Sequence, residues 1–183
     1  SGDCSVKIWS LSSKKCISTI PQAHHDSVRA LALLPGVGVV SGSHDATIKI
    51  WTYSGDCIAE LVGHTALIYS VSTSFDGSII ASGSEDNTLR LWRPDGTCIQ
   101  TIEHPGCVWS VAFLENGDVV SGCSDGVARV WSVDGQRCGS AESRASFDAL
   151  ITARKEEIAA ASKENGDGGA HGALPAGIAL EDP

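Results

Sequence analysis

The 183-residue sequence contains no methionine and no stretch of 18 or more consecutive apolar residues. A membrane-spanning helix needs about 20 such residues, so the sequence predicts none. The N-terminus also lacks the charged segment followed by an apolar run that marks a secretory signal peptide. Because the chain opens at Ser1 in the middle of a repeated phrase, we expect it to be a piece of a longer protein.

Positive charge is scarce. The chain has 13 Lys and Arg residues against 22 Asp and Glu residues, which gives a formal net charge of −9. Proteins that bind nucleic acid neutralise its phosphates with clustered Lys and Arg. Neither nucleic acid nor an anionic membrane surface is therefore an expected partner.

Sequence signals for catalysis and for cofactors are missing as well. There is no C-x-x-C pair, and His104-x-x-Cys107 is a lone half-site rather than a set of four metal ligands. No Gly-rich loop follows a predicted strand and opens a helix, as a phosphate-binding loop would. We expect no metal, no cofactor and no enzymatic activity.

What the sequence does contain is one phrase repeated four times. SGSHDATIKIW begins at residue 41, SGSEDNTLRLW at 82 and SGCSDGVARVW at 121, and the shortened SGDCSVKIW opens the chain. Each places an Asp six residues before a Trp, and the Trp residues recur at intervals of 42, 41 and 39. The Asp–Trp pairs are Asp3–Trp9, Asp45–Trp51, Asp86–Trp92 and Asp125–Trp131, and a His precedes each of the last three: His24, His64 and His104.

Turn signals divide each unit into short strands. Pro35-Gly36, Asp76-Gly77 and Asn116-Gly117 separate runs of four to seven alternating, β-branched residues. A period near 40 with three or four short strands per unit is typical of a β-propeller. The sequence therefore predicts an all-β fold, with a partial blade at 1–20 and further blades at about 21–61, 62–102 and 103–139.

These units resemble the WD-repeat family. Gly63-His64 matches the family's Gly-His blade entry, whereas Ala23 and Glu103 replace the Gly at the other two entries. The Trp-Asp dipeptide is incomplete throughout, because the four Trp residues are followed by Ser, Thr, Arg and Ser. The resemblance covers about 139 residues and implies about 3.5 blades of a seven-bladed ring. The last blade, ending in QRCGSAES, has no clear fourth strand.

The resemblance also implies why the phrase recurs. In this fold the turn Asp accepts a hydrogen bond from the entry His, which reaches a Ser on the second strand and the Trp on the third. A Ser–His–Asp catalytic triad uses the same residue types, but an active site is built once and these sets occur three times. We therefore expect a buried structural network in which every polar group is hydrogen-bonded. Its members are His24, His64 and His104; Asp45, Asp86 and Asp125; Ser41, Ser82 and Ser121; and Trp51, Trp92 and Trp131.

Four of the seven cysteines keep the same period. Successive members are 41, 41 and 40 residues apart, at Cys16, Cys57, Cys98 and Cys138. Equivalent positions on successive blades lie far apart, so these four are not expected to share a metal, and we interpret them as small strand residues. The odd number of cysteines suits a reducing compartment. We expect the protein in the cytoplasm and the nucleus.

The composition changes after Gly139. Residues 140–162 are predicted to form a helix with Ser140 as N-cap and with Phe147, Leu150, Ile151 and Ile158 on one face. Residues 163–183 are rich in Gly and are predicted to be a flexible linker towards a missing C-terminal domain.

The order of these pieces is similar to the C-terminal part of the propeller of the phospholipase A-2-activating protein family. LENGDVVSGCSDGVARVW is followed by a helix opening with SAES, then by an acidic Gly-rich stretch and LPAGIALEDP. The last stretch departs in register from the family's L-P-G-x-E-x-L. The resemblance implies a non-enzymatic adaptor in ubiquitin-dependent protein degradation and sorting. Its propeller would bind ubiquitin or ubiquitinated proteins, and modules missing here would dock on an AAA unfoldase, valosin-containing protein.

A generic WD-repeat scaffold is the alternative, such as a substrate receptor of a ubiquitin ligase or a signalling subunit. For either function, propellers bind partners on the face that carries the blade-entry loops. Arg, Tyr and Trp are enriched in interface hot spots, although Tyr and Trp also pack between blades. The two positions per blade expected on this face are Arg29, Tyr69 and Trp109, and His44, Glu85 and Ser124.

Overall fold

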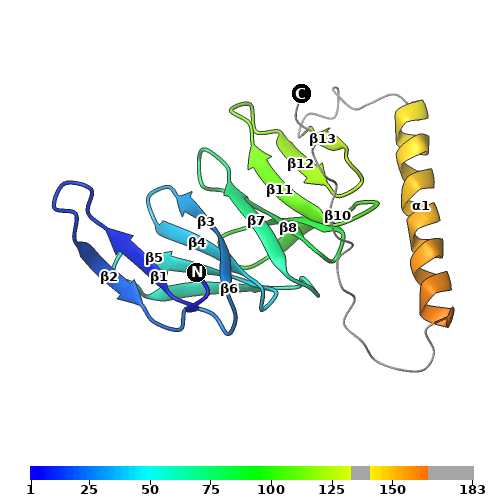
Figure 1. Ribbon diagram of the computed structural model, residues 1–183. Helices are drawn as coiled ribbons and strands as arrows, with labels where there is room; N and C mark the ends of the chain where they lie inside the picture. The colour runs from blue at the N-terminus through cyan, green and yellow to red at the C-terminus, as the bar shows by residue number, and fades with distance from the viewer. Residues whose placement is uncertain (133–140, 165–183) are drawn as a thin grey trace, which may run out of the picture.

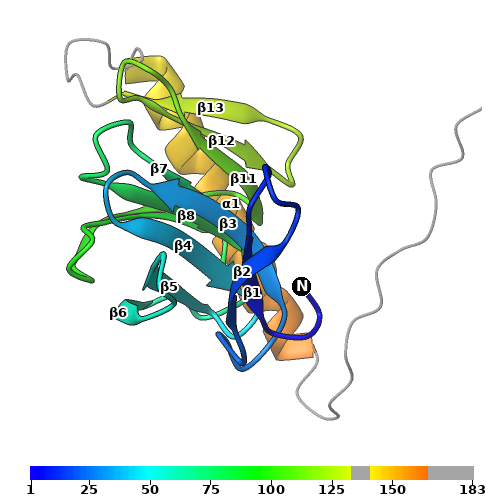
Figure 2. The ribbon, with the colours of Figure 1, turned by 90° about the vertical axis from the view of Figure 1, so that its left-hand side faces the viewer.

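The computed structural model describes residues 1–132 and 141–164. Within them lie four antiparallel sheets and one helix. In Figure 1 the sheets follow one another from β1–β2 at the left to β11–β13, with α1 beyond them. Figure 2, turned by 90°, has β1–β2 nearest the viewer and α1 at the back. The predicted all-β partial propeller followed by a helix is confirmed.

Each sheet is a meander whose strands pair in sequence order. The first blade consists of β1 (Val6–Trp9) and β2 (Cys16–Ile20). The second consists of β3 (Val28–Leu34), β4 (Gly38–Ser43), β5 (Thr47–Thr52) and β6 (Cys57–Val62). The third consists of β7 (Ile68–Thr73), β8 (Ile80–Ser84), β9 (Thr88–Trp92) and β10 (Cys98–Glu103). The fourth consists of β11 (Val108–Phe113), β12 (Val119–Cys123) and β13 (Ala128–Trp131).

The glycine of the repeated Ser-Gly pair lets one blade pack on the next. A Cβ added to Gly42 would lie 2.8 Å from Ile68 Cγ2, and one added to Gly83 would lie 2.7 Å from Val108 Cγ1. Both glycines are on the second strand of a blade and face the first strand of the following blade. Any larger residue would push the blades apart, because carbon atoms need about 3.5 Å.

Hydrogen bonds between first strands hold neighbouring blades in register. Thr73 Oγ1 donates to the carbonyl oxygen of Leu33 at 2.6 Å, and the amide of Phe113 donates to Ser72 Oγ at 3.1 Å. The apolar core spans the same junctions, since Leu34 and Ile48 of the second blade cluster with Ile68 of the third. The blades therefore form one packed arc.

The helix α1 (Ala141–Glu164) lies against the third and fourth blades. The ring of Phe147 makes an edge-on contact with Trp131 at a centroid distance of 5.4 Å, and Lys155 Nζ donates to Glu103 Oε2 at 2.6 Å. Ile151 of the predicted apolar face is half-buried, whereas Leu150 is exposed. The predicted N-cap Ser140, Cys138 and the segment 165–183 of the predicted linker lie outside the described residues.

Within residues 1–132 and 141–164, no helix combines the length and the apolar character that a membrane span requires.

Candidate functional site

The second and third blades contain the same chain of hydrogen bonds. In the third blade, His64 Nδ1 donates to Asp86 Oδ2 at 2.7 Å, and Ser82 Oγ lies 2.7 Å from His64 Nε2. Trp92 Nε1 donates to the same Ser82 oxygen at 2.8 Å. In the second blade the equivalent distances are 3.0, 2.7 and 2.7 Å, for His24–Asp45, His24–Ser41 and Trp51–Ser41.

Three further donors hold each carboxylate in place: the amide that follows the entry His, and both the amide and the hydroxyl of the Thr two residues after the Asp. Asp86 accepts from the amide of Thr65 at 3.1 Å and from the hydroxyl of Thr88 at 2.6 Å. Asp45 accepts from the amide of His25 and the hydroxyl of Thr47. These threonines were not predicted as members of the network, although Asp-x-Thr occurs in two of the four copies of the phrase. The carboxylate is thus fixed from three sides.

Burial and hydrogen bonding set the charge states of the network. Burial lowers the pKa of His24, partly offset by Asp45, so the imidazole is neutral near pH 7. Burial opposes ionisation of Asp45, but the bonds from Thr47 and from the amide of His25 prevail and lower its pKa to about 2. A neutral imidazole donates to a carboxylate at one nitrogen and accepts from the serine at the other.

The fourth blade differs from the expected pattern. His104 Nε2 still lies 2.8 Å from Ser121 Oγ. The same hydroxyl oxygen accepts a hydrogen bond from Trp131 Nε1. His104 Nδ1, however, donates to the carbonyl oxygen of Ile102 at 3.2 Å instead of to Asp125. Asp125 accepts from Arg129 at 2.6 Å, and this guanidinium lowers the pKa of Asp125 to about 2.

Two residues explain this difference. Pro105 follows His104 where His25 and Thr65 follow the other entry histidines, and proline has no amide hydrogen to donate to a carboxylate. Val127 stands where Thr47 and Thr88 stand in the other blades, so the hydroxyl donor is missing too. Without these two donors, Asp125 is free to pair with Arg129.

Burial rules out a role for the three serines as nucleophiles in the folded protein. Ser41, Ser82 and Ser121 are each 0% exposed. A substrate cannot reach their hydroxyl oxygens, and a catalytic nucleophile must lie within reach of the atom that it attacks. Among the described residues no group of three or more His, Cys, Asp or Glu side chains is placed to hold a metal ion.

The predicted partner-binding residues lie where blade-entry loops and second-to-third strand turns meet. His44 and Tyr69 make an edge-on ring contact at 6.4 Å, although they come from the second and third blades. Burial raises the pKa of Tyr69, and the neighbouring Glu85 raises it further. Cys107, which was not among the predicted partner-binding residues, donates through Sγ to the carbonyl oxygen of Glu85 at 3.6 Å. His44, Tyr69 and Glu85 therefore form one continuous cluster.

Trp109 is the most exposed aromatic residue near this cluster. Its side chain is 63% exposed, at the second position of β11, which corresponds to Tyr69 in β7. Ser124 and Arg29 are also exposed. We call the six predicted residues the entry face: Arg29, His44, Tyr69, Glu85, Trp109 and Ser124.

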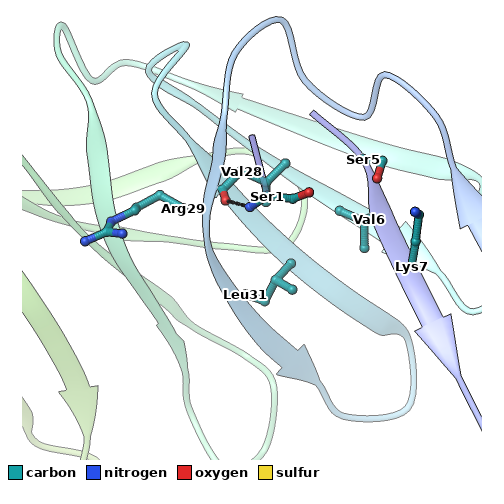
Figure 3. A pocket seen from close by; sticks show the side chains of 7 residues that line it. All are labelled: Ser1, Ser5, Val6, Lys7, Val28, Arg29 and Leu31. Carbon is teal, nitrogen blue, oxygen red and sulfur yellow. Dashed lines mark hydrogen bonds between the residues drawn. The ribbon is translucent and has the colours of Figure 1, made fainter. Parts of the chain in front are cut away.

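A hollow of about 390 Å³ lies between β1 and β3 (Figure 3). Val6, Val28 and Leu31 supply its apolar wall, and Arg29 extends away from them. Lys7 and Arg29 are its charged residues, so its lining lacks the acid–base pair that hydrolytic chemistry uses.

Comparisons with known proteins agree with this architecture. The model of the family "WD domain, G-beta repeat" matches residues 14–52, 55–93 and 96–132. The chain is 40% identical over 145 residues to the ubiquitin homeostasis protein lub1 of Schizosaccharomyces pombe, and covers 20% of that protein. It is 27% identical over 139 residues to autophagy-related protein 16 of Arabidopsis thaliana, and covers 27% of it.

A solved structure is also similar. The crystal structure of the WD40 β-propeller domain of Doa1 matches with a TM-score of 0.71 and 34% sequence identity. The match covers 76% of this chain and 47% of the Doa1 chain. The chain thus spans about a fifth of lub1 and about half of the solved Doa1 chain.

Proposed function

Because the chain belongs to the WD-repeat family and is similar to lub1 and Doa1, we propose that it is a non-enzymatic, ubiquitin-binding adaptor in ubiquitin-dependent degradation and sorting. The entry face is its binding surface, and ubiquitin or ubiquitinated proteins are its partners. In the parent protein, modules outside this chain dock on an AAA unfoldase. The free thiols of the six described cysteines support action in the reducing cytoplasm and nucleus.

One observation carries the proposal: an exposed tryptophan beside a cluster that contains an acidic residue. Trp109 is 63% exposed, and Glu85 lies next to Tyr69. Ubiquitin presents an apolar patch ringed by basic side chains. An aromatic anchor with a neighbouring carboxylate complements such a patch in both shape and charge.

The experiment is a titration of ¹⁵N-labelled ubiquitin with the chain, followed by NMR. Three proteins are compared: wild type, Trp109→Ala and Trp9→Ala. Trp9 is a matched control, because its side chain is 58% exposed but lies on β1, away from the entry face. We expect shifts on the apolar patch of ubiquitin, and affinity about tenfold weaker for Trp109→Ala but unchanged for Trp9→Ala.

Each other outcome contradicts part of the proposal. Shifts that persist equally in all three proteins would keep ubiquitin as partner and remove the entry face as its site. No shifts with wild type at millimolar concentration would leave a WD-repeat scaffold with another partner, the alternative function.

A further inference from the structure

The ends of the blades opposite the entry face also carry exposed apolar side chains. The loops that join first to second strands and third to fourth strands all lie at this end, because consecutive strands of a blade are antiparallel. Phe75 is 91% exposed, Tyr53 53% and Val37 37%, and Pro35 is exposed as well. These four residues are called the lower row.

The lower row spans two neighbouring blades. Gly38 pairs with Thr52 in the ladder between β4 and β5, so Val37 and Tyr53 are the next neighbours beyond its end. Pro35 precedes Val37 by two residues and meets the loop of Phe75, since a Cβ on Gly77 would lie 3.3 Å from Pro35 Cδ. The three loops that carry these side chains are thus neighbours at one end of the blades.

The surroundings of the lower row are acidic. The connections of the second and third blades, at 35–37, 53–56, 74–79 and 93–97, contain three acidic residues and one basic residue, Arg93. Of the flanking blades, the connection at 114–118 adds two acidic residues and the connection at 10–15 adds two basic residues, Lys14 and Lys15. Four of the acids are exposed: Asp56, Asp76, Asp95 and Glu115. Hydrogen bonds from Ser74 and Ser78 lower the pKa of Asp76 to about 2, so the carboxylate beside Phe75 is ionised at neutral pH.

We propose that the lower row is a second docking surface, which takes a partner protein's segment in which an apolar or aromatic side chain is flanked by Lys or Arg. Single exposed apolar residues are ordinary, but a row of four with an acidic rim has the pattern of an interface. Charge complementarity selects a basic segment. The surface is small, so binding is weak and transient. It leaves the entry face free, so both surfaces can be occupied at once.

The test uses fluorescence anisotropy with a short fluorescein-labelled peptide in which Lys alternates with Leu and Phe. A control peptide has Glu in place of every Lys. We expect the chain to bind the Lys peptide, to ignore the Glu peptide, and to lose about tenfold in affinity on Phe75→Ser. Trp109→Ala, on the opposite face, is expected to leave this binding unchanged. Glu115→Lys is expected to weaken it and to flatten its salt dependence.

Several results would overturn the proposal. They are equal binding of both peptides, unchanged binding by Phe75→Ser, or a loss with Trp109→Ala as large as that with Phe75→Ser. Sedimentation equilibrium supplies a further check, because a dimer that Phe75→Ser dissociates would make a second copy the occupant. Phe75 is 91% exposed, so its replacement is expected to leave the thermal unfolding midpoint unchanged.

Discussion

The third and fourth blades use the same His, Ser and Trp but treat the carboxylate of the following turn differently. In the third blade Asp86 accepts a hydrogen bond from His64. The amide of Thr65 and the hydroxyl of Thr88 also donate to Asp86 and hold the carboxylate in place. In the fourth blade Asp125 faces Arg129, and His104 donates to a backbone carbonyl. The entry histidine alone therefore does not determine which donors the carboxylate pairs with.

The supporting donors make the difference. A buried ionised carboxylate is stable only when several hydrogen bonds replace its water, so one imidazole N–H does not suffice. Pro105 and Val127 each remove one donor, and Arg129 of β13 forms an ion pair with the carboxylate instead. The guanidinium also lies 5.2 Å from the ring centre of Phe147. The fourth blade therefore exchanges a closed internal network for contacts with α1.

Removing the carboxylate is expected to have the largest effect, and to separate the two blades. Asp86→Ala leaves His64, Thr65 and Thr88 without their acceptor, at an expected cost of about 3 kcal/mol in the free energy of unfolding. Asp125→Ala removes a partly exposed ion pair and is expected to cost less than about 1 kcal/mol. Urea unfolding of both variants measures the difference. Equal costs would contradict the distinction between the blades.

The pH dependence of stability is expected to be the next largest effect. Burial lowers the pKa of His24 and of His104 below the ordinary 6.5. Below pH 6.5 the unfolded chain therefore binds protons that the folded chain does not, and stability falls as pH falls. Two histidines give a loss of about 1 to 2 kcal/mol between pH 6.5 and 5.5.

Urea midpoints from pH 8 to pH 2 measure this loss, with His104→Gln as the comparison. The variant is expected to show a shallower decline than wild type, because one of the two histidines is gone. Between pH 4 and pH 2 a further decline is expected as Asp45 is protonated, since its folded pKa is about 2 against an ordinary 3.8. A decline of equal slope in His104→Gln would mean that His104 takes its proton in the folded state.

Restoring the missing donors is expected to have the smallest effect and to make the fourth blade resemble the third. The double variant Pro105→Thr, Val127→Thr supplies an amide and a hydroxyl beside Asp125. We expect a gain of about 1 kcal/mol in the free energy of unfolding. Val127→Thr alone is the control, with a smaller gain. A double variant no more stable than the control would show that Arg129 retains the carboxylate.

Much of this architecture could be predicted from the sequence, because strand periods and the spacing of His, Asp and Trp repeat three times. The departure at Asp125 was readable in principle, at Pro105 and Val127, but only once the amide and hydroxyl donors of the other blades are known. The blades against which α1 packs were not predictable, since an apolar stripe does not determine which surface it covers. The lower row also escaped prediction, because its members come from three loops that only the packing of the blades brings together.

The most direct test of the central claim is the reciprocal titration. The chain is labelled with ¹⁵N at tryptophan, which gives five indole signals, and unlabelled ubiquitin is added. The account predicts that the indole signal of Trp109 shifts while those of buried Trp51 and Trp92 and of exposed Trp9 stay in place. A shift of Trp9 in place of Trp109, or no shift of Trp109 at saturation, would contradict the assignment of ubiquitin to the entry face.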